Sequence, residues 1–184
     1  MTGIIPGPAG AGPQPDGRRR VVLALGSNLG DRLGYLQEAV TALAACAGLS
    51  NAAVSAVYQT EPVGGPPQPG YLNAILTGET GCPARAVLEC ARQAERTAGR
   101  VRAERWGPRT LDVDVIAYGT EVCDDPELTL PHPRAHERAF VLVPWHDLDP
   151  DALLPGHGRV ADLLAGLDTA GVARLSGASL RLAA

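Results

Sequence analysis

Residues 104–119, ERWGPRTLDVDVIAYG, are the segment from which the fold of this chain can be worked out. From Thr110 to Tyr118 the residue types alternate, and a period of two predicts a β-strand. One face of that strand is expected to carry Leu111, Val113, Val115 and Ala117. The other face is expected to carry Asp112, Asp114, Ile116 and Tyr118. The two aspartates would therefore share a face, about 6.5–7 Å apart along the strand.

The paired aspartates and the arginines upstream of them predict a site for a metal ion and a phosphate. Two like charges about 4 Å apart repel by roughly 1 kcal/mol in water and by several-fold more near a protein surface. A divalent cation removes that repulsion, because it takes both carboxylates as hard oxygen ligands. Guanidinium groups bind anions, and the arginines nearby are Arg96, Arg100, Arg102, Arg105 and Arg109. The alternative is a strand end with two solvated aspartates that pair with an arginine-rich loop.

The composition is that of a soluble globular protein. The chain has 184 residues, of which 45% are hydrophobic and 20% are charged. This length predicts one domain, which we place at residues 18–184. Residues 1–17 are rich in Gly, Pro and Ala and are expected to form a flexible tail. The net charge of −4 offers no overall attraction for nucleic acid, and all 16 basic residues are arginine.

The cysteines and the hydropathy pattern predict a protein of a reducing compartment. The cysteines, Cys46, Cys82, Cys90 and Cys123, show no C-x-x-C motif and no metal-ligand spacing, so we expect buried free thiols. No apolar run approaches the roughly 18 residues that span a membrane, and the N-terminus lacks a signal-peptide pattern. The chain is therefore expected to be cytoplasmic and without a membrane partner, and we also expect a monomer.

The rest of the chain predicts the order strand–helix–strand–strand–helix–strand. Period-two patterns and short apolar runs predict strands at 20–25, 52–60, 71–80 and 110–118. Apolar residues at helical spacing predict helices over 33–47 and 83–98, and a short helix over 159–167. Residues 123–129 are expected to be turn-like, and residues 134–147 to form a helix or turn. The C-terminus is expected to be frayed or to form a small strand.

Two loops and one amide are candidates for contact with a ligand. The turn at 26–31, which begins Gly-Ser-Asn, can offer backbone N–H groups to an anion or be a plain strand-to-helix turn. The loop at 61–70 has four prolines and three glycines, so it is either a mobile lid or an irregular surface loop. After it, Asn73 offers an amide that can read the edge of a heterocycle, although an Asn near a strand end more often satisfies the backbone.

Five stretches of the chain, in order, give it a resemblance to a known family. They are LALGSNLGDR (23–32), YQTEPVGGPPQPGYLNAIL (58–76), GRVRAERWGPRTLDVDVIAYG (99–119), LTLPHPRAHERAFVL (128–142) and VPWHDLDPDALLP (143–155). The chain resembles the 6-hydroxymethyl-7,8-dihydropterin pyrophosphokinases of folate biosynthesis. The resemblance implies an α+β, ferredoxin-like fold, with a mainly antiparallel sheet of about four strands and helices on both faces.

The resemblance also implies a reaction. ATP would donate its β,γ-diphosphate to the hydroxymethyl oxygen of the dihydropterin, giving AMP and the pterin diphosphate. By similarity, Asp112 and Asp114 would hold two Mg²⁺ ions, and Arg100 and Arg109 would be catalytic. The implied ATP-binding residues are Glu95, Arg102, Arg109, Val115, Leu128, Thr129, His132 and Arg138. The implied pterin-binding residues are Thr60, Glu61, Val63, Tyr71, Asn73, Trp106 and Phe140, of which Phe140 would otherwise be read as core packing.

The chain departs from the better-known family pattern in three places. The segment between Arg102 and Trp106 is one residue shorter and lacks a lysine. Pro133 follows His132 where an aromatic residue is common, and Glu61 stands where proline is common. None of these departures removes a predicted metal ligand.

Two other functions are consistent with parts of the sequence. A nucleic-acid-binding module would use the arginines at 96–109, and salt-sensitive binding to single strands without ATP-dependent chemistry would identify it. A catalytically inactive regulatory relative would be expected to have lost the aspartate pair or His132, and this chain retains both. The enzyme is therefore the leading hypothesis.

Overall fold

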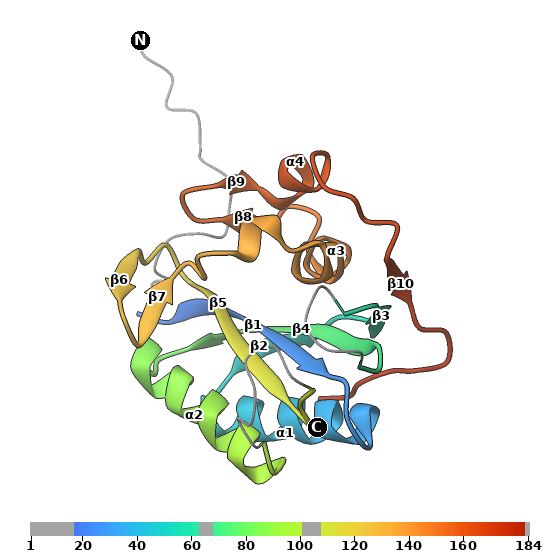
Figure 1. The fold of residues 1–184 in the computed structure, drawn as a ribbon. Coiled ribbons are helices and arrows are strands. Elements are labelled where there is room, and N and C mark those ends of the chain that lie inside the picture. The colour runs from blue at the N-terminus through green and yellow to red at the C-terminus, as the bar shows by residue number, and fades with distance from the viewer. Residues whose placement is uncertain (1–16, 63–67, 101–107, 183–184) are drawn as a thin grey trace.

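An antiparallel sheet forms the centre of the molecule (Figure 1). The computed structural model describes residues 17–62, 68–100 and 108–182. In these residues the sheet has six strands, in the order β10-β3-β4-β1-β5, with β2 also paired to β4. The strands are β1 (Arg19–Ser27), β2 (Ser50–Val54), β3 (Tyr58–Thr60), β4 (Tyr71–Thr80), β5 (Asp112–Tyr118) and β10 (Val172–Arg174).

Helices cover both faces of this sheet (Figure 1). On one face lie α1 (Arg32–Cys46) and α2 (Ala84–Thr97). On the other face lie α3 (Ala139–Leu148) and α4 (Val160–Leu164), and a 3₁₀ turn, η1 (Ala135–Glu137), precedes α3. Two short hairpins complete the fold: β6 (Cys123–Asp125) with β7 (Leu128–Leu130), and β8 (Leu153–Leu154) with β9 (Gly158–Arg159). The predicted α+β class, with an antiparallel sheet between helices, is confirmed.

The central strand β1 supplies side chains to both hydrophobic cores, because alternate residues of a strand face opposite sides. Leu23 and Leu25 are buried on the side of α1 and α2, where Leu36 of α1 also lies. Val22 is buried on the side of α3, where it joins Val141. The predicted helix starting near residue 33 is confirmed, and the Asp31 side chain caps it by accepting a hydrogen bond from the Gly34 N–H at 3.0 Å.

The predicted alternation of β5 is wrong at its end, because a β-bulge shifts the phase. Val22 pairs with Ala117, whereas Leu23 pairs with Val115, so Ile116 has no partner of its own on β1. Ala117 therefore lies in the core beside α3, and Tyr118 lies in the core beside α1 and α2. This is the reverse of the prediction. The bulge comes after Asp112 and Asp114, so their predicted common face is retained, and both line the same cavity.

The predicted strand at 52–60 is broken into β2 and β3. At the break, Ser55 pairs with Ile75 twice: its backbone N–H donates to the Ile75 carbonyl, and its hydroxyl accepts from the Ile75 N–H, both at 2.9 Å. The hydroxyl thus replaces a backbone carbonyl of the ladder. Residues 123–129, predicted to be turn-like, instead form most of the β6–β7 hairpin, and the small C-terminal strand is β10.

Two of the four cysteines are joined, so the prediction of free thiols is wrong for them. Cys46, at the end of α1, forms a disulfide with Cys90 in α2, and their Cα atoms are 5.8 Å apart. Their spacing in the sequence could not reveal the contact, because it arises from two helices that lie side by side on one face of the sheet (Figure 1). Cys82 and Cys123 are free, as predicted, but they are half-buried rather than buried.

Two other expectations concern the flexible N-terminal tail and the lack of a membrane-spanning segment. Most of the predicted flexible tail, residues 1–16, lies outside the described residues and stays a prediction. Within the described residues, no helix has the length and apolar character needed to cross a membrane.

The disulfide predicts a loss of stability when either partner is replaced. Because it closes a loop between residues 44 apart in the sequence, Cys46→Ser is expected to lower the free energy of unfolding by about 2–5 kcal/mol, measured by urea denaturation. Cys82→Ser is the control and should have a smaller effect. Denatured, unreduced protein should expose only the thiols of Cys82 and Cys123, and titration of all four cysteines would contradict the assignment.

Candidate active site

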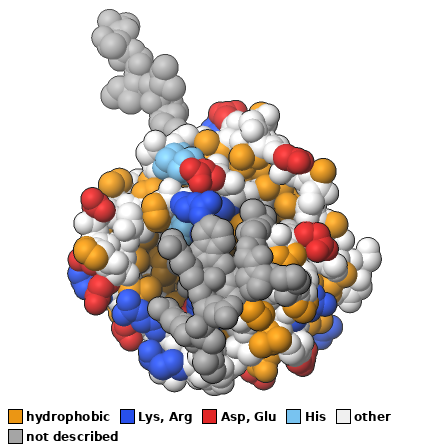
Figure 2. All heavy atoms as spheres, viewed as in Figure 1, with side chains coloured by type: hydrophobic (Ala, Val, Ile, Leu, Met, Phe, Trp, Pro, Cys, Tyr) orange, Lys and Arg blue, Asp and Glu red, His pale blue; other side chains and the backbone are white. Residues whose placement is uncertain are grey.

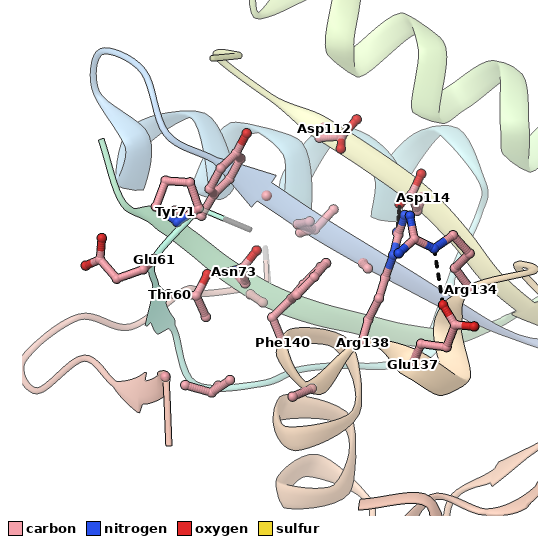
Figure 3. A pocket seen from close by; sticks show the side chains of 18 of the residues that line it. Thr60, Glu61, Tyr71, Asn73, Asp112, Asp114, Arg134, Glu137, Arg138 and Phe140 are labelled. Carbon is pink, nitrogen blue, oxygen red and sulfur yellow. Dashed lines mark hydrogen bonds and ion pairs between the residues drawn. The ribbon is translucent and has the colours of Figure 1, made fainter. Parts of the chain in front are cut away.

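A cavity of about 640 Å³ lies between the sheet and the start of α3 (Figure 3). Its size is that of a small-molecule site. Strands β1, β3, β4 and β5 contribute to it from the sheet, and the η1–α3 segment contributes from the opposite side. It brings together many of the residues predicted for a site: Thr60, Glu61, Tyr71, Asn73, Arg109, Asp112, Asp114, Arg138 and Phe140.

At one end of the cavity, each aspartate of β5 pairs with arginine. Asp112 lies 2.6 Å from Arg100 and 2.9 Å from Arg109. Asp114 lies 2.8 Å from Arg138, which reaches it from the start of α3 (Figure 3). Both aspartates are half-buried rather than solvated, with side-chain exposures of 27% and 32%. The predicted neighbourhood of paired carboxylates and guanidiniums is therefore present in the folded chain.

The surface charges around this end are also compensated locally. On the face shown in Figure 2, basic side chains lie beside acidic ones. Arg134, at the cavity rim, pairs with Glu137 at 3.2 Å. Burial opposes the charge of Arg109, but Asp112, Tyr71 and Asp114 together outweigh it and raise the pKa of its guanidinium. Arg109 therefore stays cationic and available to an anionic ligand.

Glu95 holds β5 in position from behind the cavity. It is a buried carboxylate on α2, 7% exposed. It accepts hydrogen bonds from the backbone N–H of Val113, at 3.0 Å, and from the Arg100 guanidinium. Val113 separates the two aspartates, so this contact fixes the backbone from which both project. Glu95 does not line the cavity, and its predicted contact with ATP stays a prediction.

His132 lies beside Asp114 as a neutral ring. Its Nδ1 accepts a hydrogen bond from the Arg134 backbone N–H at 3.1 Å, which leaves the ring proton on Nε2. Nε2 faces the Asp114 carboxylate at 3.7 Å. Burial lowers the pKa of His132, and Arg138 lowers it further, whereas Asp114 acts in the opposite direction. At neutral pH the ring therefore offers an N–H donor without adding charge.

The other end of the cavity has an amide and an aromatic ring. The Asn73 side chain is buried, and its Nδ2 donates to the Thr60 hydroxyl at 2.8 Å. Phe140 extends from α3 toward the sheet (Figure 3), where it packs against the core and also lines the cavity. The Arg138 guanidinium carbon lies 5.6 Å from the centre of that ring. Burial raises the pKa of Tyr71, so its hydroxyl remains a neutral donor.

Some predicted residues are not at the cavity or are not described. Val63, Arg102 and Trp106 lie outside the described residues. Val115 and Leu128 are buried in the core beside α1 and α2. The remaining predicted residues do not line the cavity: Arg100, Thr129 and His132. The predicted catalytic role of Arg100 and the predicted contacts of Thr129 and His132 with ATP stay predictions.

Asn28 is a residue that sequence reasoning did not select, and it joins two segments at the site. Its side chain is buried, and its Oδ1 accepts from the Arg109 N–H at 2.8 Å. Its own backbone N–H donates to the Arg109 carbonyl at 3.1 Å. Its Nδ2 donates to Gln68 Oε1 at 2.8 Å and to the Pro69 carbonyl at 3.2 Å. The sequence did contain a signal for this role, which is the amide in the Gly-Ser-Asn turn. An amide that becomes buried needs a hydrogen-bond partner for each polar atom, so it tends to join segments.

The C-terminal part of the chain also reaches the cavity. Asp168, Gly171 and Val172 line it, and Val172 of β10 pairs with Thr60 of β3. No motif marks these residues. They reach the site because β10 adds to the free edge of β3, which is a property of the topology.

The fold and the cavity together define a class of protein. A group of cations and carboxylates beside a pocket for a flat ring is suited to an enzyme that moves phosphate to or from a ring-bearing molecule. The class is therefore that of the phosphate-transferring enzymes.

Comparison with known proteins identifies the family. Residues 22–150 match 7,8-dihydro-6-hydroxymethylpterin-pyrophosphokinase (HPPK). A 2-amino-4-hydroxy-6-hydroxymethyldihydropteridine pyrophosphokinase of Mycobacterium leprae is 49% identical over 151 residues, 76% of this chain and 77% of that protein. The Mycobacterium bovis protein of the same name is 46% identical over 164 residues, 82% of this chain and 85% of that protein. The chain belongs to this family and is a pyrophosphokinase of folate biosynthesis.

Solved structures support the fold independently. A crystal structure of Plasmodium falciparum HPPK-DHPS aligns with a TM-score of 0.60 at 11% sequence identity, covering 80% of this chain and 44% of that one. This chain thus spans less than half of the length of that protein. At this level of identity the likeness concerns the fold alone.

Asn28 predicts a test of how the site is held together. Asn28→Ala removes the side-chain contacts to both segments, and a misplacement of about 1 Å at a site can cost on the order of 100-fold in rate. We expect kcat/KM to fall by about 10- to 100-fold while the protein still folds, as measured by steady-state kinetics and circular dichroism. Asn28→Asp keeps the acceptor for the Arg109 N–H but loses the donor, so it should retain more activity. Equal activity of Asn28→Ala and the unchanged protein would contradict the positioning role.

Proposed function

We propose that this protein transfers the β,γ-diphosphate of ATP to the hydroxymethyl oxygen of 6-hydroxymethyl-7,8-dihydropterin, with Mg²⁺, giving AMP and the pterin diphosphate. The observation that carries the proposal is a single cavity with a charged end and an end that has an amide and an aromatic ring. Asp112, Asp114 and their arginines lie at one end, and Asn73 and Phe140 lie at the other. A polyphosphate suits the first end, and a flat heterocycle with a polar edge suits the second.

The donor set at Asp112 and Asp114 fits magnesium. Among the described residues, no group of three or more His, Cys, Asp or Glu side chains is arranged to hold a metal ion. Mg²⁺ does not require such a group, because it is usually bound by one or two carboxylates together with substrate phosphates and water. Asp112 and Asp114 are the residues that would hold the two Mg²⁺ ions of this proposal. Bound there, the ions would supply charge that offsets the triphosphate and the leaving AMP, and would promote attack by the hydroxymethyl group.

The arginines contribute by changing partners. Without a nucleotide, Arg109 and Arg138 are held in place by Asp112 and Asp114. With a nucleotide, the same guanidiniums are within reach of phosphate oxygens, to which they can bind through two parallel hydrogen bonds. His132 adds a neutral N–H donor on the same side. The site is thus arranged for a triphosphate without requiring a large movement of the β5 backbone.

The ring end orients the acceptor. The Asn73 amide keeps one N–H donor and its acceptor oxygen for the polar edge of a pterin, since its other N–H donates to Thr60, and the face of Phe140 offers a stacking surface. With the ring held there, the hydroxymethyl oxygen is directed toward the phosphate end. A bond forms between that oxygen and the β-phosphorus, the bond from the β-phosphorus to the oxygen that AMP retains breaks, and the hydroxyl proton is released. Catalysis then comes mainly from positioning and charge compensation.

We further propose that residues 18–184 act as one domain, and that the protein works as a cytoplasmic monomer without nucleic acid or a membrane as a partner. The disulfide between Cys46 and Cys90 argues against a cytoplasmic location, because structural disulfides are uncommon in the cytosol of most organisms. Alkylation of thiols in intact cells, followed by counting of blocked cysteines, tests it. If Cys46 and Cys90 are fully alkylated in cells, their thiols are free there, and a reducing compartment is supported.

The product of ATP tests the reaction type. Incubation of the protein with ATP, Mg²⁺ and the hydroxymethyl dihydropterin should yield AMP in step with pterin diphosphate, as resolved by ion-exchange chromatography. Omission of the pterin is the control and should leave ATP intact. Formation of ADP would mean that a single phosphoryl group had moved, and the proposal would be wrong.

The aspartates test the proposed metal site. Asp112→Ala and Asp114→Ala should each lower turnover by about 10³-fold, which corresponds to the several kcal/mol expected from lost charge stabilisation. Both variants should fold, because neither carboxylate is in a hydrophobic core. Asp151→Ala is the matched control, since that side chain is 86% exposed and far along the chain from β5, and it should keep its activity. A near-normal rate in either β5 variant would rule out the metal role.

A further inference from the structure

We propose that Gly26 of β1 sets the depth of the ring-binding end of the cavity, and so restricts the substrate to a ring with nothing projecting from the face that lies on β1. The inference rests on the proposed function, because it concerns the pterin. It adds a specificity-determining residue that the side-chain pattern of the sequence did not single out.

Gly26 lies where the two ends of the cavity meet. In the sheet it pairs with Asn73 of β4 on one side and with Asp112 of β5 on the other. It is buried and lines the cavity, as do Asn73 and Asp112. A molecule that contacts both the amide and the paired carboxylates must therefore cross directly over Gly26.

Neither the backbone conformation at position 26 nor the packing around it requires a glycine. Gly26 is not among the residues with positive φ, so its backbone conformation is open to any L-amino acid. A Cβ built on it would lie 3.4 Å from Asn73 Oδ1, 3.9 Å from the Asp112 Cβ and 3.9 Å from the Tyr71 Cδ1. These are ordinary van der Waals separations, so alanine fits the described protein without displacing a neighbour. Glycine inside a strand weakens it, so its presence here has a cost without a structural return.

The space that an alanine methyl would take belongs to the cavity. Its three nearest atoms all come from residues that line the cavity: Asn73, Tyr71 and Asp112. Ala24, two residues before Gly26 on β1, is small as well; it lies on the α3 side of the sheet and lines the cavity floor. Phe140 faces this floor from α3 (Figure 3). The ring-binding end is thus a slot between Ala24 and Gly26 of β1 and an aromatic face, and Gly26 forms its floor beside Asn73.

The test compares the same chemical change at two glycines. Gly26→Ala adds a methyl inside the slot. Gly81→Ala, between β4 and α2, adds it where no atom lies within 4 Å and where φ is not positive. For both variants and the unchanged protein, the dissociation constants for the hydroxymethyl pterin and for ATP with Mg²⁺ are measured separately by calorimetry, together with thermal unfolding.

Gly26→Ala is expected to weaken pterin binding by about tenfold or more, the scale on which one added carbon is rejected by a fitted pocket. Its affinity for ATP should stay within about twofold, and its midpoint of unfolding should be unchanged or higher, because the methyl meets no protein atom closely. Gly81→Ala should leave both affinities unchanged. This pattern would support Gly26 as the residue that sets the depth of the slot.

Three results would overturn the inference. They are pterin affinity unchanged in a folded Gly26→Ala, equal losses for pterin and ATP, and failure of Gly26→Ala to fold, since this last result would contradict the packing argument. The unchanged protein separates these results from failure of the proposed function. If it binds no pterin and forms no AMP, the proposed function is wrong, whereas if it does both, only the role of Gly26 is in question.

Discussion

The pairing of β1 with both β4 and β5 is the constraint on which the rest of the structure depends. It sets the distance between the amide end and the carboxylate end of the cavity, because residues of the three strands meet in fixed register. It also divides the β1 side chains between the two hydrophobic cores. A slip of one residue would turn Asp112 and Asp114 into the core beside α1 and α2, so packing and catalysis require the same register.

Charge compensation explains how the site persists without its ligands. Two carboxylates and three guanidiniums are half-buried in a small volume, and each carboxylate contacts at least one guanidinium. Burial makes unpaired charges costly, so these pairs keep the half-buried charges compensated when no ligand is bound. A nucleotide with its metal ions carries both signs of charge, so it can replace these contacts without leaving either group unpaired. The same side chains therefore compensate the charges of the empty site and are available for ligand recognition.

Local pattern predicted the parts of the fold that depend on neighbouring residues. The strand with Asp112 and Asp114 on one face and the helices beside the sheet follow from the periods of the apolar residues. The family resemblance, confirmed by comparison, led to the residues that we predict to bind the ring; by sequence pattern alone, Asn73 and Phe140 are assigned more readily to a strand end and to the core. What sequence could not provide depends on partners far along the chain. The bulge at Ile116 arises from register with β1, the disulfide from adjacent helices, and the role of Asn28 from two segments that meet around it.

The position of β5 at the border of the sheet has a consequence of its own. In the described residues no strand pairs with its outer side, and a bare strand edge invites addition of a strand from a second molecule. The Glu95 carboxylate occupies the Val113 N–H on that side and thereby blocks one of the groups such an addition would use. Replacement of Glu95 should thus promote self-association as well as disturb the aspartates. A poorly active Glu95 variant would need its aggregation state measured before any loss of rate is attributed to chemistry.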